Sequence, residues 1–90
     1  MKFEWDPQKA NLNLRKHGIS FEEATTAFRD PLSVTAPDLT HSSTEDRFVT
    51  FGLSSQGKLL TISHTERGES IRIITARRST KHERKIYEEA

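Results

Sequence analysis

The stretch from Lys58 to Ala76, KLLTISHTERGESIRIITA, contains two alternating apolar segments joined by a polar, glycine-containing link. Leu60 and Ile62 share one face of the first segment, and Ile71 and Ile73 share one face of the second. Alternation with a period of two is typical of half-buried strands, and a polar link with glycine favours a turn. The stretch therefore predicts an antiparallel hairpin with one apolar face.

The register of this hairpin follows from matching its apolar residues across the two strands. With 66–69 as the turn, Ile62 faces Ile73 and the apolar pairs coincide. Arg67 then lies at the turn, and Arg77 lies at the opposite end of the hairpin. At about 3.3 Å per residue these two ends are roughly 20 Å apart. One compact site is not expected to use both arginines directly, whereas an RNA several nucleotides long could contact both.

The second face of the predicted hairpin mixes hydroxyls, apolar side chains and arginines. Its residues are Leu59, Thr61, Ser63, Arg72, Ile74, Ala76 and Arg78. Such a face can hold a nucleic-acid backbone, and it can equally be a solvated sheet face whose arginines serve solubility.

The flanking sequence completes a single α+β domain over residues 1–90. The expected elements are a strand at 3–5, a helix at 7–17, a helix that follows Ser20 and stops at Asp30, strands at 33–36 and 47–53, and a helix that follows Thr80 and runs to about Glu89. The two N-terminal helices should pack on a mainly antiparallel sheet of about four to five strands, with the last helix at the C-terminus. A polar loop at 37–46 is the best candidate for a mobile segment.

Capping signals mark where these helices begin. Asp6 precedes a proline, which is typical of a helix start. Ser20 with Glu23 and Thr80 with Glu83 have the spacing of a capping box, in which each side chain bonds the other residue's backbone N–H.

Composition excludes several classes of site. The chain has no cysteine, and its four histidines lack ligand spacing, so neither a metal site nor a cofactor is expected. No apolar run approaches the roughly 18 residues of a membrane span. The N-terminus lacks the apolar segment of a secretion signal. A cytoplasmic protein without a membrane partner is expected.

Positive charge is concentrated in the second half of the chain. Residues 1–46 hold five cations and eight anions, while residues 47–90 hold nine cations and five anions. The cations between positions 64 and 87 are Arg67, Arg72, Arg77, Arg78, Lys81, Arg84 and Lys85. Such clustering favours an anionic partner, and phosphate is the obvious anion.

His64 and Arg67 form a candidate pair for proton transfer and phosphate binding. Histidine is the side chain whose ordinary pKa lies near neutrality, and arginine clamps phosphate while staying charged. RNA cleavage by its own 2′-OH needs a base, a cation and an acid. Alternation, however, places His64 on the face of Leu60 and Ile62, so a structural strand-end histidine bonded to backbone stays an equal alternative.

A family resemblance extends over nearly the whole chain. It is carried by Phe3-Glu4-Trp5-Asp6-Pro7, Asn13-Leu14-Arg15-Lys16-His17-Gly18, Phe21-Glu22-Glu23-Ala24, Asp30-Pro31, His64-Thr65-Glu66-Arg67-Gly68 and Ile71 to Arg78. These motifs, in this order, resemble the BrnT family of RelE-type toxins from bacterial type II toxin–antitoxin systems. The resemblance implies a metal-independent endoribonuclease that cuts RNA, on the ribosome or free of it, and stops translation. It also implies a DNA-binding BrnA-like antitoxin, assembled with the toxin as a heterotetramer.

The resemblance also suggests where the site lies. RelE-type toxins share a basic concave sheet face, which maps here to Arg72 and Arg78 with Arg67 and Arg77 at its ends. The expected catalytic residues are Arg67, Arg77 and His64. The expected RNA-binding residues are Arg72, Arg78, Lys81, Arg84 and Lys16.

No general base is evident in the sequence. One interpretation is that arginines stabilise the transition state while the substrate or ribosome supplies the groups that transfer protons. A non-catalytic module that binds RNA or an acidic partner therefore stands as the alternative.

Overall fold

The predicted α+β architecture is confirmed by a computed structural model, which describes residues 1–40 and 46–90. Its elements are β1 (Lys2–Glu4), α1 (Pro7–His17), α2 (Phe21–Ala27), β2 (Val34–Pro37), β3 (Arg47–Leu53), β4 (Leu59–Arg67), β5 (Ser70–Arg78) and α3 (Lys81–Glu89). Residues 41–45, in the loop expected to be mobile, lie outside the described residues. Within the described residues no helix is long and apolar enough to cross a membrane.

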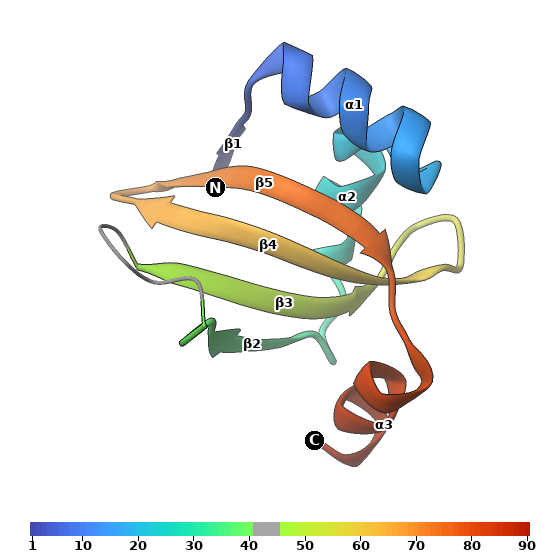
Figure 1. The fold of residues 1–90 in the computed structure, drawn as a ribbon. Coiled ribbons are helices and arrows are strands. Elements are labelled where there is room, and N and C mark those ends of the chain that lie inside the picture. The colour runs from blue at the N-terminus through green and yellow to red at the C-terminus, as the bar shows by residue number, and fades with distance from the viewer. Residues whose placement is uncertain (41–45) are drawn as a thin grey trace.

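The five strands form one mixed sheet in the order β1-β5-β4-β3-β2. β1 runs parallel to β5, and the other neighbours are antiparallel, as the turn-linked strands predict. Helices α1 and α2 lie on one side of the sheet, and α3 lies on the other side, beyond the end of β5 (Figure 1). One sheet face is therefore covered by the N-terminal helices, and the opposite face is only partly covered.

The core lies between the two N-terminal helices and the sheet. Phe21, Ala24 and Ala27 of α2 are completely buried against Leu60 and Ile62 of β4. This burial confirms the apolar face predicted for the hairpin.

The register predicted for the hairpin is wrong. Arg67 pairs with Ser70, so the turn contains only Gly68 and Glu69. Gly68 has φ +60°, which a tight two-residue hairpin turn requires and glycine adopts without strain. Together with a register shift between Ser63 and His64, this turn places Ile62 opposite Ala76 instead of Ile73.

A β-bulge in β5 changes which residues share a face. The register shifts between Ser63 and His64, and Ile74 is left as the extra residue opposite that step. An extra residue reverses the alternation beyond it. Ala76, predicted on the second face, is instead completely buried in the core.

The bulge also exchanges the faces of the two adjacent arginines. Arg78 lies opposite Leu60, a core residue, whereas Arg77 lies opposite Thr61. Residues directly opposite one another share a face. The prediction that Arg78 belongs to the open face is therefore wrong, and Arg77 takes that place.

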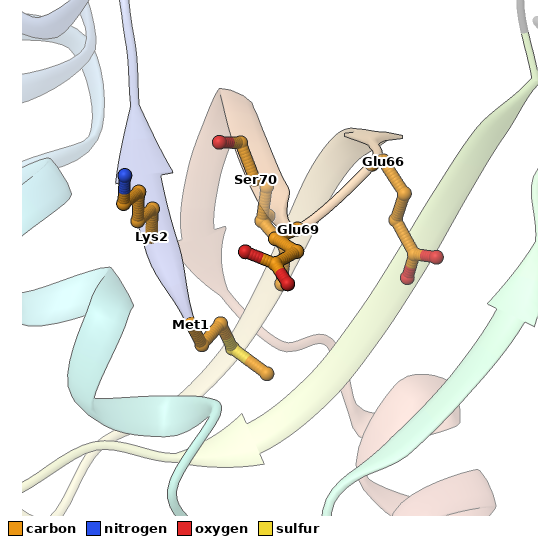
Figure 2. Close-up of a pocket in the computed structure, with 7 residues that line it drawn as sticks. Met1, Lys2, Glu66, Glu69 and Ser70 are labelled. Carbon is orange, nitrogen blue, oxygen red and sulfur yellow. The ribbon is translucent and has the colours of Figure 1, made fainter.

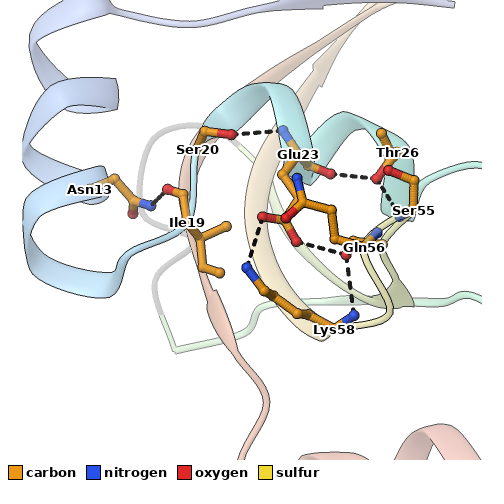
Figure 3. A network of polar contacts seen from close by, with 9 residues as sticks. Asn13, Ile19, Ser20, Glu23, Thr26, Ser55, Gln56 and Lys58 are labelled. Carbon is orange, nitrogen blue, oxygen red and sulfur yellow. Dashed lines mark hydrogen bonds and ion pairs between the residues drawn. The ribbon is translucent and has the colours of Figure 1, made fainter.

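Of the two predicted capping boxes, the second is confirmed and the first is only half formed. Thr80 and Glu83 bond each other's backbone N–H groups at the start of α3. Ser20 accepts the N–H of Glu23 at 3.0 Å, but the Glu23 carboxylate accepts from the Ser54 hydroxyl at 2.7 Å instead. Lys58 lies 3.4 Å from the same carboxylate, as Figure 3 shows. This buried carboxylate ties α2 to the β3–β4 turn.

Candidate nucleic-acid site

A hollow of about 730 Å³ lies on the sheet face opposite α1 and α2. Its lining includes Val49 and Phe51 of β3, Thr61 and Ser63 of β4, and Ile74, Thr75 and Arg77 of β5. Glu83 and Ile86 of α3 close one end, and β2 with the residues after it contributes a second wall. The charged residues of the lining are Asp38, Arg47, Arg77 and Glu83, so the hollow combines an apolar floor with hydroxyls, two arginines and two carboxylates.

Arg77 is the cation that α3 fixes at this hollow. Its Nη1 donates to Glu83 Oε1 at 2.7 Å and its Nη2 donates to Glu83 Oε2 at 2.8 Å. The Arg77 side chain keeps 39% of its surface exposed, against 16% for Glu83. The carboxylate therefore lies behind the guanidinium, and the guanidinium lies nearer to solvent.

Hydroxyl and backbone donors hold the carboxylate in place. Thr61 donates to Glu83 Oε1 at 3.1 Å, and the Thr80 N–H donates to the same oxygen at 2.8 Å. The Thr61 hydroxyl also lies 2.8 Å from the Ser79 hydroxyl. Glu83 therefore links the N-terminus of α3 to strands β4 and β5.

These contacts keep the ion pair charged. The hydrogen bond from Arg77 outweighs the effect of burial and, with the Thr80 and Thr61 donors, lowers the pKa of Glu83 to about 2. The hydrogen bond to Glu83 in turn raises the pKa of Arg77 against the opposing effect of burial. At neutral pH the site holds one fixed carboxylate and one fixed guanidinium.

A second polar contact anchors α3 on its far side. The Tyr87 hydroxyl donates to Asp30 Oδ2 at 2.5 Å, and the same oxygen accepts the Leu53 N–H at 2.8 Å. No residue of α3 is buried. The position of this helix therefore depends on a few specific contacts at Glu83, Ile86 and Tyr87.

The structure separates the expected catalytic residues. Arg67 is exposed at the hairpin tip and pairs with Ser70, while Arg77 pairs with Thr61 at the other end of β4. Six residues of strand between these positions correspond to about 20 Å. Arg67 and Arg77 are therefore not brought together, in agreement with the separation expected from the hairpin.

His64 lies in the core and has no exposed surface. Its Nε2 lies 2.8 Å from the Thr50 hydroxyl, which lies 2.7 Å from the Thr35 hydroxyl. Phe28 and Phe48 pack against the imidazole ring. Burial lowers the pKa of His64 to about 4, so the ring is neutral at pH 7. These contacts favour a structural role for His64, but the Nε2 contact is with the Thr50 side chain and not with the backbone as expected.

The expected RNA-binding residues divide between the two sides of the sheet. Lys81 and Arg84 are exposed on α3, and Arg72 is partly exposed opposite Thr65. Lys16 is exposed in the last turn of α1, on the helix-covered side with Arg78. The structure therefore brings only the first three to the open side of the molecule.

Sequence reasoning missed two residues of the hollow. Arg47 lines it from the start of β3, and Glu83 was recognised only as a helix cap. Glu83 lies six positions after Arg77, across a strand end and a helix start. No periodic pattern links residues across such a junction. The only available signal was that a helix-capping glutamate follows shortly after an arginine of opposite charge.

A second hollow, of about 490 Å³, lies where the β4–β5 hairpin tip meets the N-terminus. Figure 2 shows Glu66 and Glu69 at this hollow together with Lys2 and Met1. Two carboxylates here oppose one lysine and the terminal ammonium. The first hollow has the same formal balance, because Asp38 and Glu83 accompany Arg47 and Arg77 in its lining, so charge count alone does not separate the two hollows.

Comparison with known proteins identifies the family. Residues 5–83 match the family described as the ribonuclease toxin, BrnT, of type II toxin–antitoxin systems. The chain belongs to the BrnT family. The predicted resemblance is thereby confirmed, and membership of a toxin–antitoxin family implies an antitoxin partner.

A solved BrnT structure has the same fold. The Brucella abortus ribonuclease toxin BrnT, in a crystal structure at 1.1 Å resolution, superposes with a TM-score of 0.69 at 21% sequence identity. The match covers 90% of this chain and 99% of the Brucella BrnT chain. No curated protein sequence matches this chain.

Proposed function

We propose that this chain is the endoribonuclease toxin of a type II toxin–antitoxin pair, cleaving RNA without a metal ion and thereby inhibiting translation. Membership of the BrnT family supports the ribonuclease chemistry. The single observation that carries the site assignment is the Arg77 guanidinium, which is fixed at a hollow of the open sheet face and keeps 39% of its side-chain surface exposed.

The proposed reaction uses the substrate's own nucleophile. The 2′-oxygen attacks the adjacent phosphorus, and the bond to the 5′-oxygen breaks, which leaves a 2′,3′-cyclic phosphate. Negative charge builds on the phosphoryl oxygens during this step, and Arg77 is placed to neutralise it. Charge stabilisation by fixed donors commonly supplies a large share of a rate enhancement.

Proton transfer is assigned to groups outside this constellation. His64 is buried and neutral, and Glu83 has a pKa of about 2, which makes its carboxylate a weak base at neutral pH. We propose that solvent, the RNA or the ribosome supplies the base and the acid. The catalytic contribution of this chain would then be electrostatic.

Other cations would extend the RNA path. Arg72, Lys81 and Arg84 lie on the open side and would contact phosphates beyond the cleaved bond. Arg67, about 20 Å away along β4, would contact a more distant nucleotide. Lys16 and Arg78 lie on the helix side and would contact RNA only if it wraps around the sheet edge.

The proposed antitoxin is a BrnA-like, DNA-binding protein that forms a heterotetramer with this chain. A hollow with an apolar floor, in which the Arg77 side chain is more exposed than its partner Glu83, suits a partner segment that carries apolar side chains and an acidic group for Arg77. Covering this hollow would exclude RNA and silence the toxin.

The second candidate function is a non-catalytic module that binds RNA or an acidic partner. It is favoured by one specific observation: both terminal nitrogens of Arg77 already bond Glu83, whose low pKa makes it a weak base. Binding alone would need only the basic surface.

Cleavage of a labelled RNA by the purified protein separates the two functions. A toxin shortens the RNA in the presence of EDTA and leaves a strand with 2′-deoxy residues intact, because the nucleophile is missing. A binding module retards both strands on a gel and shortens neither. In a bacterial host, growth arrest and new RNA 5′ ends, both reversed by the neighbouring antitoxin gene, would extend the result to translation.

A further inference from the structure

The pairing of Arg77 with Glu83 leaves one edge of the guanidinium available. A guanidinium carries five N–H donors, and the end-on contact with Glu83 uses one from each terminal nitrogen. A longer contact of 3.4 Å runs from Nη1 to the Arg78 carbonyl oxygen. Among the described residues nothing accepts from Nε. The edge formed by Nε and Nη2 can therefore take a phosphate through two parallel hydrogen bonds.

Glu83 is itself held by two donors besides Arg77. The Thr80 N–H and the Thr61 hydroxyl both donate to Oε1, the oxygen that also accepts Arg77 Nη1. The start of α3, strand β4 and strand β5 thus converge on one carboxylate. A carboxylate fixed by these donors can fix an arginine in turn.

We infer that Glu83 is a positioning residue that orients Arg77 so that its Nε–Nη2 edge faces a phosphate bound in the hollow. This inference rests on the proposed function. An arginine that is free in solution loses rotamer entropy when it is ordered. Here the Arg77 side chain is already ordered in the folded protein, so its loss of entropy does not add to the activation free energy of cleavage.

A competing interpretation is that the Glu83 carboxylate blocks the position that the phosphate would take on Arg77. In that case, removing the charge of Glu83 would free Arg77 and speed cleavage. If Glu83 positions Arg77, removing its charge slows cleavage while RNA affinity is maintained or improved, because a negative charge has left the site. The sign of the change in rate therefore decides between them.

The test compares Glu83→Gln with Glu88→Gln in the full chain. Glu88 lies on the same helix, is 59% exposed and approaches Arg84 only at 4.0 Å, so its substitution removes the same charge without contacting Arg77. We expect Glu83→Gln to lower the single-turnover RNA cleavage rate about 10- to 100-fold. Binding of a single-stranded DNA of the same sequence should be unchanged or tighter. Glu88→Gln should cleave within about threefold of wild type.

Two further variants separate positioning from helix stability. Thr80→Ala removes the cap hydroxyl of α3 and keeps the Glu83 carboxylate, so it should reduce the rate much less than Glu83→Gln. Combined with Arg77→Ala, Glu83→Gln should add no further loss, because Glu83 acts through Arg77. An unchanged or faster rate for Glu83→Gln, a full additional loss in the double variant, or an equal loss in Thr80→Ala overturns the inference. A wild-type protein that leaves RNA intact overturns the proposed function, and this inference with it.

Discussion

Asn13 in α1 pairs with both backbone polar groups of Ala76 in β5, although the two residues are 63 positions apart in the sequence. The amide Nδ2 donates to the Ala76 carbonyl at 2.8 Å and Oδ1 accepts the Ala76 N–H at 3.0 Å. β1 ends its pairing with β5 at Arg72. The side chain of Asn13 therefore supplies the pairing that a longer β1 would have given to the edge of β5.

Asn13→Ala should lower the free energy of unfolding by about 2–4 kcal/mol, because it leaves buried backbone groups of Ala76 without partners. Asn13→Asp should cost at least as much, since a carboxylate cannot donate to the Ile19 and Ala76 carbonyls that Nδ2 now bonds. Urea unfolding measures both changes. Asn11→Ala, at an exposed position of the same helix, should stay within about 0.5 kcal/mol of wild type. A midpoint for Asn13→Ala equal to that of Asn11→Ala would contradict the assignment.

Gly52→Ala should destabilise the fold by about 1–3 kcal/mol through overpacking. A Cβ atom at this position would lie 2.5 Å from the Ala27 carbonyl oxygen, a backbone atom that cannot move without shifting α2. Thermal unfolding should show a lowered Tm. Leu53→Ala is the neighbouring control, because Leu53 is 44% exposed and its truncation creates no clash. A Tm for Gly52→Ala at or above wild type would show that α2 can yield at this contact.

The order of helices and strands could be predicted from the sequence because local signals define these elements. Alternating apolar residues marked the strands, and the Thr80 capping box marked α3. The register failed because the two-residue turn at Gly68 and the bulge at Ile74 leave no periodic signature. One inserted residue moved Arg78 off the open face and placed Arg77 on it.

The candidate site was predictable only as a basic region. Arg77 was selected as an arginine at the end of the predicted face, but its contact with Glu83 depends on how α3 packs after β5. The burial of His64 depends on Phe28 and Phe48, which come from separate parts of the chain. Tertiary contacts of this kind are not encoded in any short motif.

Arg77→Ala should reduce the rate of RNA cleavage by about 10²- to 10³-fold, the range seen when a fixed donor to a transition-state oxygen is removed. Arg78→Ala is the matched comparison, because it deletes the same side chain one residue away on the other face of the sheet. We expect that variant to lose only a few-fold, through weaker long-range attraction of RNA. Single-turnover cleavage at fixed salt measures both. Equal losses in the two variants would mean that net charge, not the open-face site, governs activity.

Acidification should destabilise the fold between pH 6.5 and pH 4 through His64. Burial lowers its pKa from 6.5 to about 4. Between these two values His64 is protonated in the unfolded chain and neutral in the native state, so protonation favours unfolding. Stability is therefore complete above about pH 6.5 and decreases as the pH falls, by roughly 2 kcal/mol at pH 5. Urea unfolding at pH 7.5 and pH 5 measures the change. His64→Leu removes the titrating group and should lose less stability over the same interval, although it is less stable at pH 7.5 because the Thr50 hydroxyl loses one of its two hydrogen-bond partners. An identical pH dependence in the wild type and His64→Leu would show that another group controls acid sensitivity.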